Sequence, residues 1–170
     1  GSLAWMAMEW KKFGKPSALG IATGMVAGLG TITPASGFVS PAAALVIGLS
    51  AGVICFYMVI FVKHKLKIDD SLDVFPVHGI GGILGTLLAG VFASTELGLF
   101  SGYGFAKPEY TMLDQLGVQA LGVVATFVYT ALVTWVLLKL IGLFAPLRVT
   151  GDEETQGLDI ALHEERGYDL

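Results

Sequence analysis

Four long apolar runs limit what this chain can fold into. They cover about 17–36, 41–62, 74–93 and 113–147. Each contains about the 20 residues that a helix needs to cross roughly 30 Å of hydrocarbon. The chain is 54% hydrophobic and 14% charged, whereas soluble domains are about 25% charged. We therefore expect an all-α integral membrane protein, built as a polytopic transmembrane helix bundle.

The segments outside the apolar runs predict three regions. Residues 1–16 are interpreted as the end of a preceding helix followed by a basic loop, residues 17–147 as the membrane domain, and residues 148–170 as a tail. No signal peptide is recognisable, and we expect the chain to begin within a longer protein. The single Cys55 lies in an apolar run, which favours a packing role. The net charge of −4 gives no reason to expect a nucleic-acid partner.

The distribution of basic residues predicts the orientation of the helices. Short cytoplasmic loops are rich in Lys and Arg. In this chain the basic residues gather at three places that are two crossings apart, whereas the opposite loops hold only Lys107. The residues at the three basic places are Lys11, Lys12, Lys15, Lys63, Lys65, Lys67 and Arg148. The lysine-rich side is thus expected to be cytoplasmic. We therefore expect a multi-pass protein of the cell (inner) membrane, with its carboxyl terminus in the cytoplasm.

Small residues recur every four positions in three of the runs. Such spacing lets helix backbones approach closely in lipid, where van der Waals packing drives association. It predicts a close-packed bundle through the following positions: Gly20, Gly24, Gly28, Gly48, Gly52, Gly81, Gly85 and Ala89.

His78 is the candidate functional residue, because it stands near the start of the third run. An ionisable group in a membrane helix is a functional-site hypothesis by default. At 100° per residue, Gly81, Gly82, Gly85 and Ala89 are expected on the same helix face. Two interpretations remain open: a buried histidine that is hydrogen-bonded to a neighbouring helix, or a polar group in a conduction path.

The residues before His78 predict how its helix begins. Ser71 or Asp73 is expected to cap the helix, and Pro76 is tolerated in the first turn because its missing N–H has no intrahelical partner there. The helix dipole and desolvation would then both favour a neutral imidazole. For Asp73 we favour a structural cap over direct binding of a cation.

The motifs, taken together, resemble the ammonium transporter (Amt) family, whose relatives include the Rhesus-type ammonia channels. The matching segments lie in family order at residues 14–17 (GKPS), 28–37 (GLGTITPASG), 69–82 (DDSLDVFPVHGIGG), and 157–159 (GLD) with His163 and Tyr168. The resemblance implies the last four helices, and a fragment of the one before, of an eleven-helix transporter. It also implies a homotrimer with one pore in each subunit.

By this resemblance the chain takes part in ammonium transport. In that family, ammonium gives up its proton and crosses a narrow apolar pore as ammonia, while the proton is carried separately, and the resemblance implies the same for this chain. His78 would be one of two paired pore histidines, Val74 a nearby pore-lining residue, and Asp73 the acid that supports the start of the pore helix. The partner histidine, the aromatic gate and the outer ammonium site are expected in the half that precedes this chain. No residue is given a catalytic role, and no metal or cofactor is expected.

The tail combines acidic and basic residues, a composition typical of disordered segments. The resemblance implies instead that it docks at the cytoplasmic face and contacts the PII signalling protein through five positions: Gly157, Leu158, Asp159, His163 and Tyr168. Two alternatives to transport remain at this point. They are an ammonium sensor on the same scaffold, which the short tail disfavours, and a Rhesus-type gas channel, which the PII-type tail disfavours.

Overall fold

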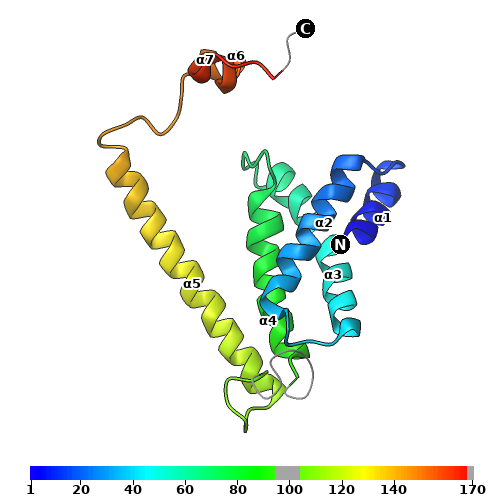
Figure 1. Ribbon diagram of the computed structural model, residues 1–170. Coiled ribbons are helices and arrows are strands. Elements are labelled where there is room, and N and C mark those ends of the chain that lie inside the picture. The colour runs from blue at the N-terminus through cyan, green and yellow to red at the C-terminus, as the bar shows by residue number, and fades with distance from the viewer. Residues whose placement is uncertain (95–103, 168–170) are drawn as a thin grey trace. The chain divides into compact units, whose positions relative to one another are not determined.

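The computed structural model describes residues 1–94 and 104–167, and all regular structure in these ranges is helical (Figure 1). Contacts divide the chain into two compact units, Gly1–Ala125 and Thr126–Leu170, and the boundary falls within helix α5. The elements in chain order are α1 (Ser2–Phe13), α2 (Ala18–Ile32), η1 (Thr33–Ala35), α3 (Pro41–Ile60), η2 (Phe61–Lys65), η3 (Phe75–Ile80), α4 (Gly81–Phe92), α5 (Met112–Ile141), α6 (Gly151–Gln156) and α7 (Leu158–His163).

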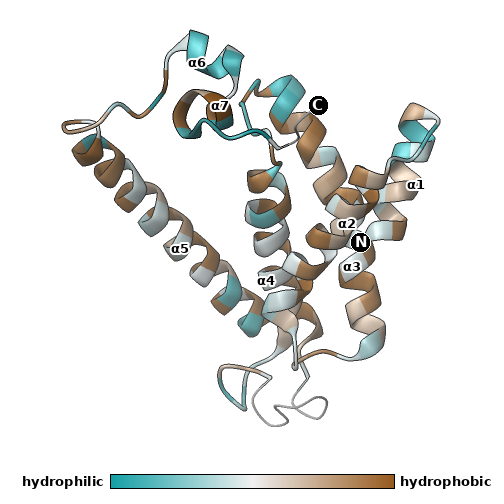
Figure 2. Cartoon of the chain, turned by 45° about the horizontal axis from the view of Figure 1, so that its top comes forward, coloured by the Kyte–Doolittle hydropathy of each residue, from teal (hydrophilic) through white to brown (hydrophobic). Residues whose placement is uncertain are grey.

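The four apolar runs form helices that are long and apolar enough to cross a membrane. Figure 2 shows their predominantly hydrophobic colouring. The spans are Ala18–Ala35, Pro41–Lys65, Phe75–Phe92 and Met112–Ile141. The prediction of an all-α membrane bundle is therefore confirmed within the described ranges.

The fourth span ends earlier than the hydrophobicity of the sequence suggests. We expected it to extend to residue 147, but α5 ends at Ile141 and gives way to turns. Gly142 still donates its N–H to the Leu138 carbonyl at 2.9 Å, and the chain leaves the helix before Pro146. A proline disfavours helical conformation in the residue before it. Apolar character alone therefore overestimates the length of this helix.

Serine side chains fix the starts of two helices in the first unit. Ser17 accepts the N–H of Gly20 at 2.8 Å, and Ser40 accepts the N–H of Ala43 at 3.3 Å. The Glu9 carboxylate of α1 accepts the Ser17 N–H at 2.7 Å and so ties α1 to the beginning of α2. These bonds satisfy donors that a helix amino terminus leaves without an intrahelical partner.

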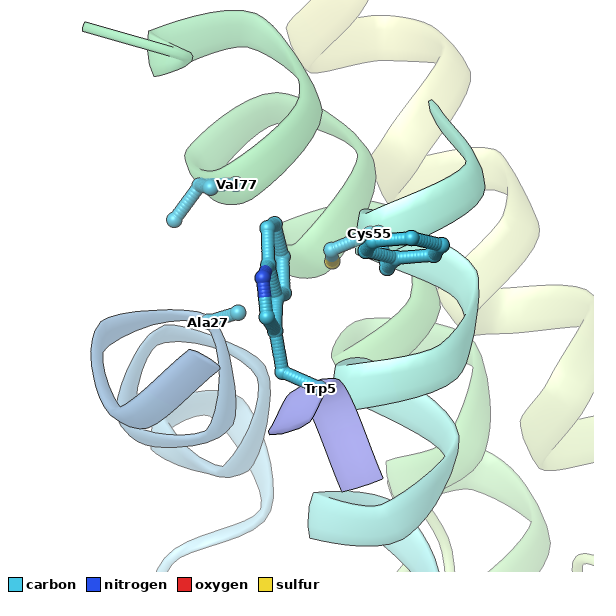
Figure 3. Close-up of a cluster of buried hydrophobic side chains, with 5 residues drawn as sticks. Trp5, Ala27, Cys55 and Val77 are labelled. Atoms are coloured by element: carbon cyan, nitrogen blue, oxygen red, sulfur yellow. The ribbon is translucent and has the colours of Figure 1, made fainter. Parts of the chain in front are cut away.

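One of the two buried clusters of the first unit lies where α1, α2, α3 and η3 meet. In Figure 3 the indole of Trp5 rises from α1 between Ala27 of α2 and Cys55 of α3, towards Val77 of η3. The Trp5 and Phe56 rings meet edge to face, with centroids 5.6 Å apart. Cys55 is fully buried in this cluster, which agrees with its predicted packing role.

The second unit contains two short helices in the tail. The prediction of disorder from composition alone is wrong for the described part of the tail. Thr150 and Glu153 form a reciprocal capping box at the start of α6. Arg148 also pairs with Glu154, with 2.5 Å between Nε and Oε1. Local hydrogen bonds of this kind stabilise a short helix that has no buried apolar face.

Candidate functional site

The segment that leads to His78 lies between two π-helical turns. The first, η2, follows α3, and the second, η3, begins at Phe75 after a loop. The hydrogen bonds of a π turn span five residues, whereas those of an α-helix span four. In η2, for example, Leu66 donates its N–H to the Phe61 carbonyl at 3.1 Å. Turns of this type occur frequently at functional sites.

Asp70 caps the helix that carries His78. Its two carboxylate oxygens accept the N–H groups of Val74 and Phe75, each at 2.8 Å. The expectation that Ser71 or Asp73 provides the cap is therefore wrong. An anion at this position both satisfies the donors and complements the positive end of the helix dipole.

Asp73 has a different contact, because its backbone is left-handed with φ of 56°. In this conformation its carbonyl accepts the Val77 N–H at 3.0 Å, and its side chain turns to Lys63 of η2. Lys63 Nζ and Asp73 Oδ1 lie 2.7 Å apart as an ion pair without hydrogen-bond alignment. The Asp73 side chain is 19% exposed and that of Lys63 is 35% exposed. The pair joins the end of α3 to the start of η3.

His78 itself faces away from the packed core. It is exposed on this chain, whereas Pro76 and Val77, the two residues directly before it in the same turn, are buried. Val74, one turn earlier, is also exposed at 51%. Within the described residues neither ring nitrogen of His78 forms a hydrogen bond. The interpretation of a histidine hydrogen-bonded to a neighbouring helix therefore gains no support from this part of the chain.

The small residues after His78 divide between two faces, contrary to our expectation that they share its face. Gly81, Gly85 and Ala89 are buried, whereas a Cβ at Gly82 would meet nothing within 4 Å in the described structure. The π turn holds more residues per turn than an α-helix, and this shifts the register between His78 and α4. The buried row therefore continues from Val77.

The buried row packs against Thr31 of α2. A Cβ at Gly85 would collide with the Thr31 carbonyl oxygen, and one at Gly81 would lie 2.8 Å from Thr31 Oγ1. The predicted close packing of small residues is confirmed at both positions. Thr31 is fully buried, and its hydroxyl lies beside the Cys55 thiol without an aligned hydrogen bond. This contact fixes η3 and α4 against α2, and with them the position of His78.

Four of the five predicted contact residues in the tail lie in or beside α7. Gly157 has φ of 96°, a conformation that favours glycine, and separates α6 from α7. Leu158 and Asp159 begin α7, and His163 ends it. Tyr168 lies outside the described residues.

Sequence reasoning gave no role at the site to Asp70, Lys63 or Glu9, and it used Lys63 only to predict the orientation of the helices. Asp70 gave no usable signal, because it binds N–H groups four and five residues further on, whereas a capping side chain usually binds those two or three residues on. The roles of Lys63 and Glu9 depend on contacts between separate helices, and spacing along the chain does not reveal such contacts.

The chain is similar to known ammonium transporters over nearly its whole length. A curated "Ammonium transporter" of Bacillus subtilis (strain 168) is 40% identical over 168 residues, which are 99% of this chain and 41% of that protein. A "Putative ammonium transporter" of Methanothermobacter thermautotrophicus is 47% identical over 172 residues, covering all of this chain and 41% of that protein. The chain thus spans about two fifths of the length of these relatives.

Solved structures agree with this relationship. A structure titled "Sensor Amt Protein" matches with a TM-score of 0.81 and 32% identity, over 95% of this chain and 38% of that one. Saccharomyces cerevisiae Mep2 matches with a TM-score of 0.77 and 34% identity, over 89% of this chain and 35% of that one. The model of the Ammonium Transporter Family matches residues 1–168. The chain therefore belongs to the Ammonium Transporter Family.

Proposed function

We propose that this chain is the carboxy-terminal part of a membrane transporter that moves ammonium, and that His78 and Val74 line the path. The proposal depends most on one observation, that His78 is exposed at the start of an apolar helix whose other face is packed. An unpaired imidazole facing lipid would be unfavourable, so its open side favours contact with another part of the transporter or with the cargo. Family membership supports the same conclusion.

The mechanism follows from the chemistry of the imidazole. A neutral ring carries one donor and one acceptor nitrogen, and so can exchange hydrogen bonds with ammonia and with a second histidine. Asp70 holds the start of the helix, and the pair of Asp73 with Lys63 holds the adjoining loop. These contacts hold the backbone segment that carries His78. The apolar residues around it disfavour passage of a charged ion, so ammonia crosses while the proton moves separately.

Assembly and regulation form a further part of the proposal. The chain would work in a homotrimer within the cell membrane, with its carboxyl terminus in the cytoplasm. The tail would contact a PII-type signalling protein through Gly157, Leu158, Asp159, His163 and Tyr168. The described part of the tail supports this idea, because Leu158 is 45% exposed at the start of α7. Binding of purified PII protein to the membrane-embedded transporter, with and without Leu158→Asp, tests this contact.

Ammonium flux through the full-length protein tests the transport proposal. The protein is reconstituted in liposomes, and currents or internal pH changes are recorded after an ammonium jump. A saturable signal that is absent from protein-free liposomes is expected. Ammonium binding without any flux would indicate a sensor and would refute transport.

A further inference from the structure

The residue of α2 that faces His78 is a glycine. A Cβ built at Gly30 would lie 4.0 Å from His78 Nδ1 and 4.0 Å from the Val77 carbonyl oxygen. These are ordinary van der Waals separations, so alanine would fit without displacing either group. Gly30 also lies inside a regular helix and is not among the glycines with positive φ. Within the described residues, neither the backbone nor the packing requires glycine at this position.

Other glycines of α2 have a clear packing role that Gly30 lacks. A Cβ at Gly24 would collide with the Trp5 side chain, and one at Gly28 would lie 3.1 Å from the backbone of Gly1. These residues let α1 approach α2. Gly30 is two positions beyond Gly28, about 200° around the helix, and therefore lies on another face. A helix with glycine in its interior is less stable than one with alanine. Glycine at position 30 therefore lowers the stability of α2 without a packing benefit among the described residues.

Gly30 borders an open strip on the surface of η3 and α4. Val74 and His78 are exposed along this strip, and Gly82 has open space at its Cβ position. A side chain at position 30 would extend towards the Nδ1 edge of the imidazole. The bare backbone of α2 instead leaves this edge uncovered.

We propose that Gly30 is a specificity-determining residue, whose missing side chain leaves room beside His78 for a small amine such as ammonia to pass. The inference rests on the proposed transport function and concerns the size of the cargo. A side chain at position 30 would narrow the space next to the imidazole. A cargo that is larger by one methyl group would be affected first.

Graded substitutions in the full-length protein test this proposal. Gly30→Ala and Gly30→Val are reconstituted in liposomes, and currents evoked by ammonium and by methylammonium are compared. One methylene group changes discrimination in an apolar space by about 10- to 200-fold. We expect Gly30→Val to lower the ratio of methylammonium to ammonium current at least about tenfold, with Gly30→Ala in between. A matched control is Gly122→Val in α5, where an added Cβ meets nothing within 4 Å in the described structure; it should keep the wild-type ratio.

Thermal stability separates a specificity role from a structural one. Gly30→Ala should unfold at the wild-type temperature or above it, because alanine favours the helix. An unchanged current ratio in both variants would overturn the proposal. So would an equal loss of both currents together with a lower unfolding temperature, since that result indicates a packing role. If the wild-type protein passes no ammonium, the transport proposal fails by itself, whatever the variants do.

Discussion

Removal of the Asp70 carboxylate should loosen the start of the helix that carries His78. Asp70 accepts two backbone N–H bonds, from Val74 and Phe75, at 2.8 Å each. Replacement of a helix-capping side chain by Ala costs about 0.5–2 kcal/mol, and a hydrogen bond to a charged group is worth about 1.5–3 kcal/mol. Because water can replace part of these bonds at the helix end, we expect Asp70→Ala to cost about 2 kcal/mol.

Amide hydrogen exchange measures this effect locally. A cost of about 2 kcal/mol corresponds to roughly a 30-fold increase in the opening equilibrium, and it should appear in peptides that cover residues 74–80 of the full-length protein. Asp70→Asn keeps one acceptor oxygen but presents an amide donor to the second N–H, so about half of the effect is expected. Exchange in the other helices should stay close to the wild-type rate.

Asp69→Ala is the matched control, since it removes a neighbouring exposed carboxylate that forms no hydrogen bond among the described residues. Its exchange rates should stay within about twofold of the wild type, because surface substitutions usually change stability by less than about 0.5 kcal/mol. Equal protection in the Asp70→Ala and Asp69→Ala proteins would refute the capping role of Asp70.

Two further predictions follow from contacts elsewhere in the chain. Gly85→Leu should lower the melting temperature of the detergent-solubilised protein strongly or prevent folding, because its side chain would collide with the Thr31 carbonyl oxygen. Gly82→Ala is the control and should melt like the wild type, because a Cβ at Gly82 meets nothing within 4 Å in the described structure. Similar melting of both variants would contradict the packing of Gly85 against Thr31. In the tail, hydrogen bonds from the Thr150 hydroxyl and backbone lower the pKa of Glu153 below its ordinary value of 4.5. A lowered pKa stabilises the folded form above pH 4.5, and this contribution is lost as the pH falls through and below that value. Amide exchange at residues 151–156, corrected for intrinsic rates, should therefore rise upon acidification. If a Thr150→Val protein shows the same pH response, the hydrogen bonds between Thr150 and Glu153 are not its cause.

The helices of the membrane domain were predictable from the sequence, because hydrocarbon requires long apolar runs whose backbone groups bond internally. The prediction failed where local geometry departs from the regular α-helix. The π turn at Phe75–Ile80 shifts the register after His78. For this reason Gly81 and Gly85 occupy the buried face and not the face of His78. A constant angle of 100° per residue has no means of representing this change.

The candidate site was predictable in its central residue but not in its support. His78 stood out because ionisable residues are rare in membrane helices. Assignment of the cap failed because both Asp70 and Asp73 precede the helix, and the choice depends on the left-handed backbone of Asp73. The partner of Asp73 is Lys63, which belongs to the preceding span. Such a contact is decided by tertiary packing and has no signature in local spacing.

The most direct test of the account is the ammonium current of the His78→Ala transporter in full-length form, measured in liposomes at matched protein density. His64→Ala is the control, because His64 is exposed in the basic turn that follows α3, outside the row of Val74 and His78. We expect a changed ammonium current or a changed selectivity against protons in the His78→Ala protein. The His64→Ala protein should match the wild type. Wild-type current and selectivity in the His78→Ala protein would contradict the central claim that His78 lines the path for ammonium.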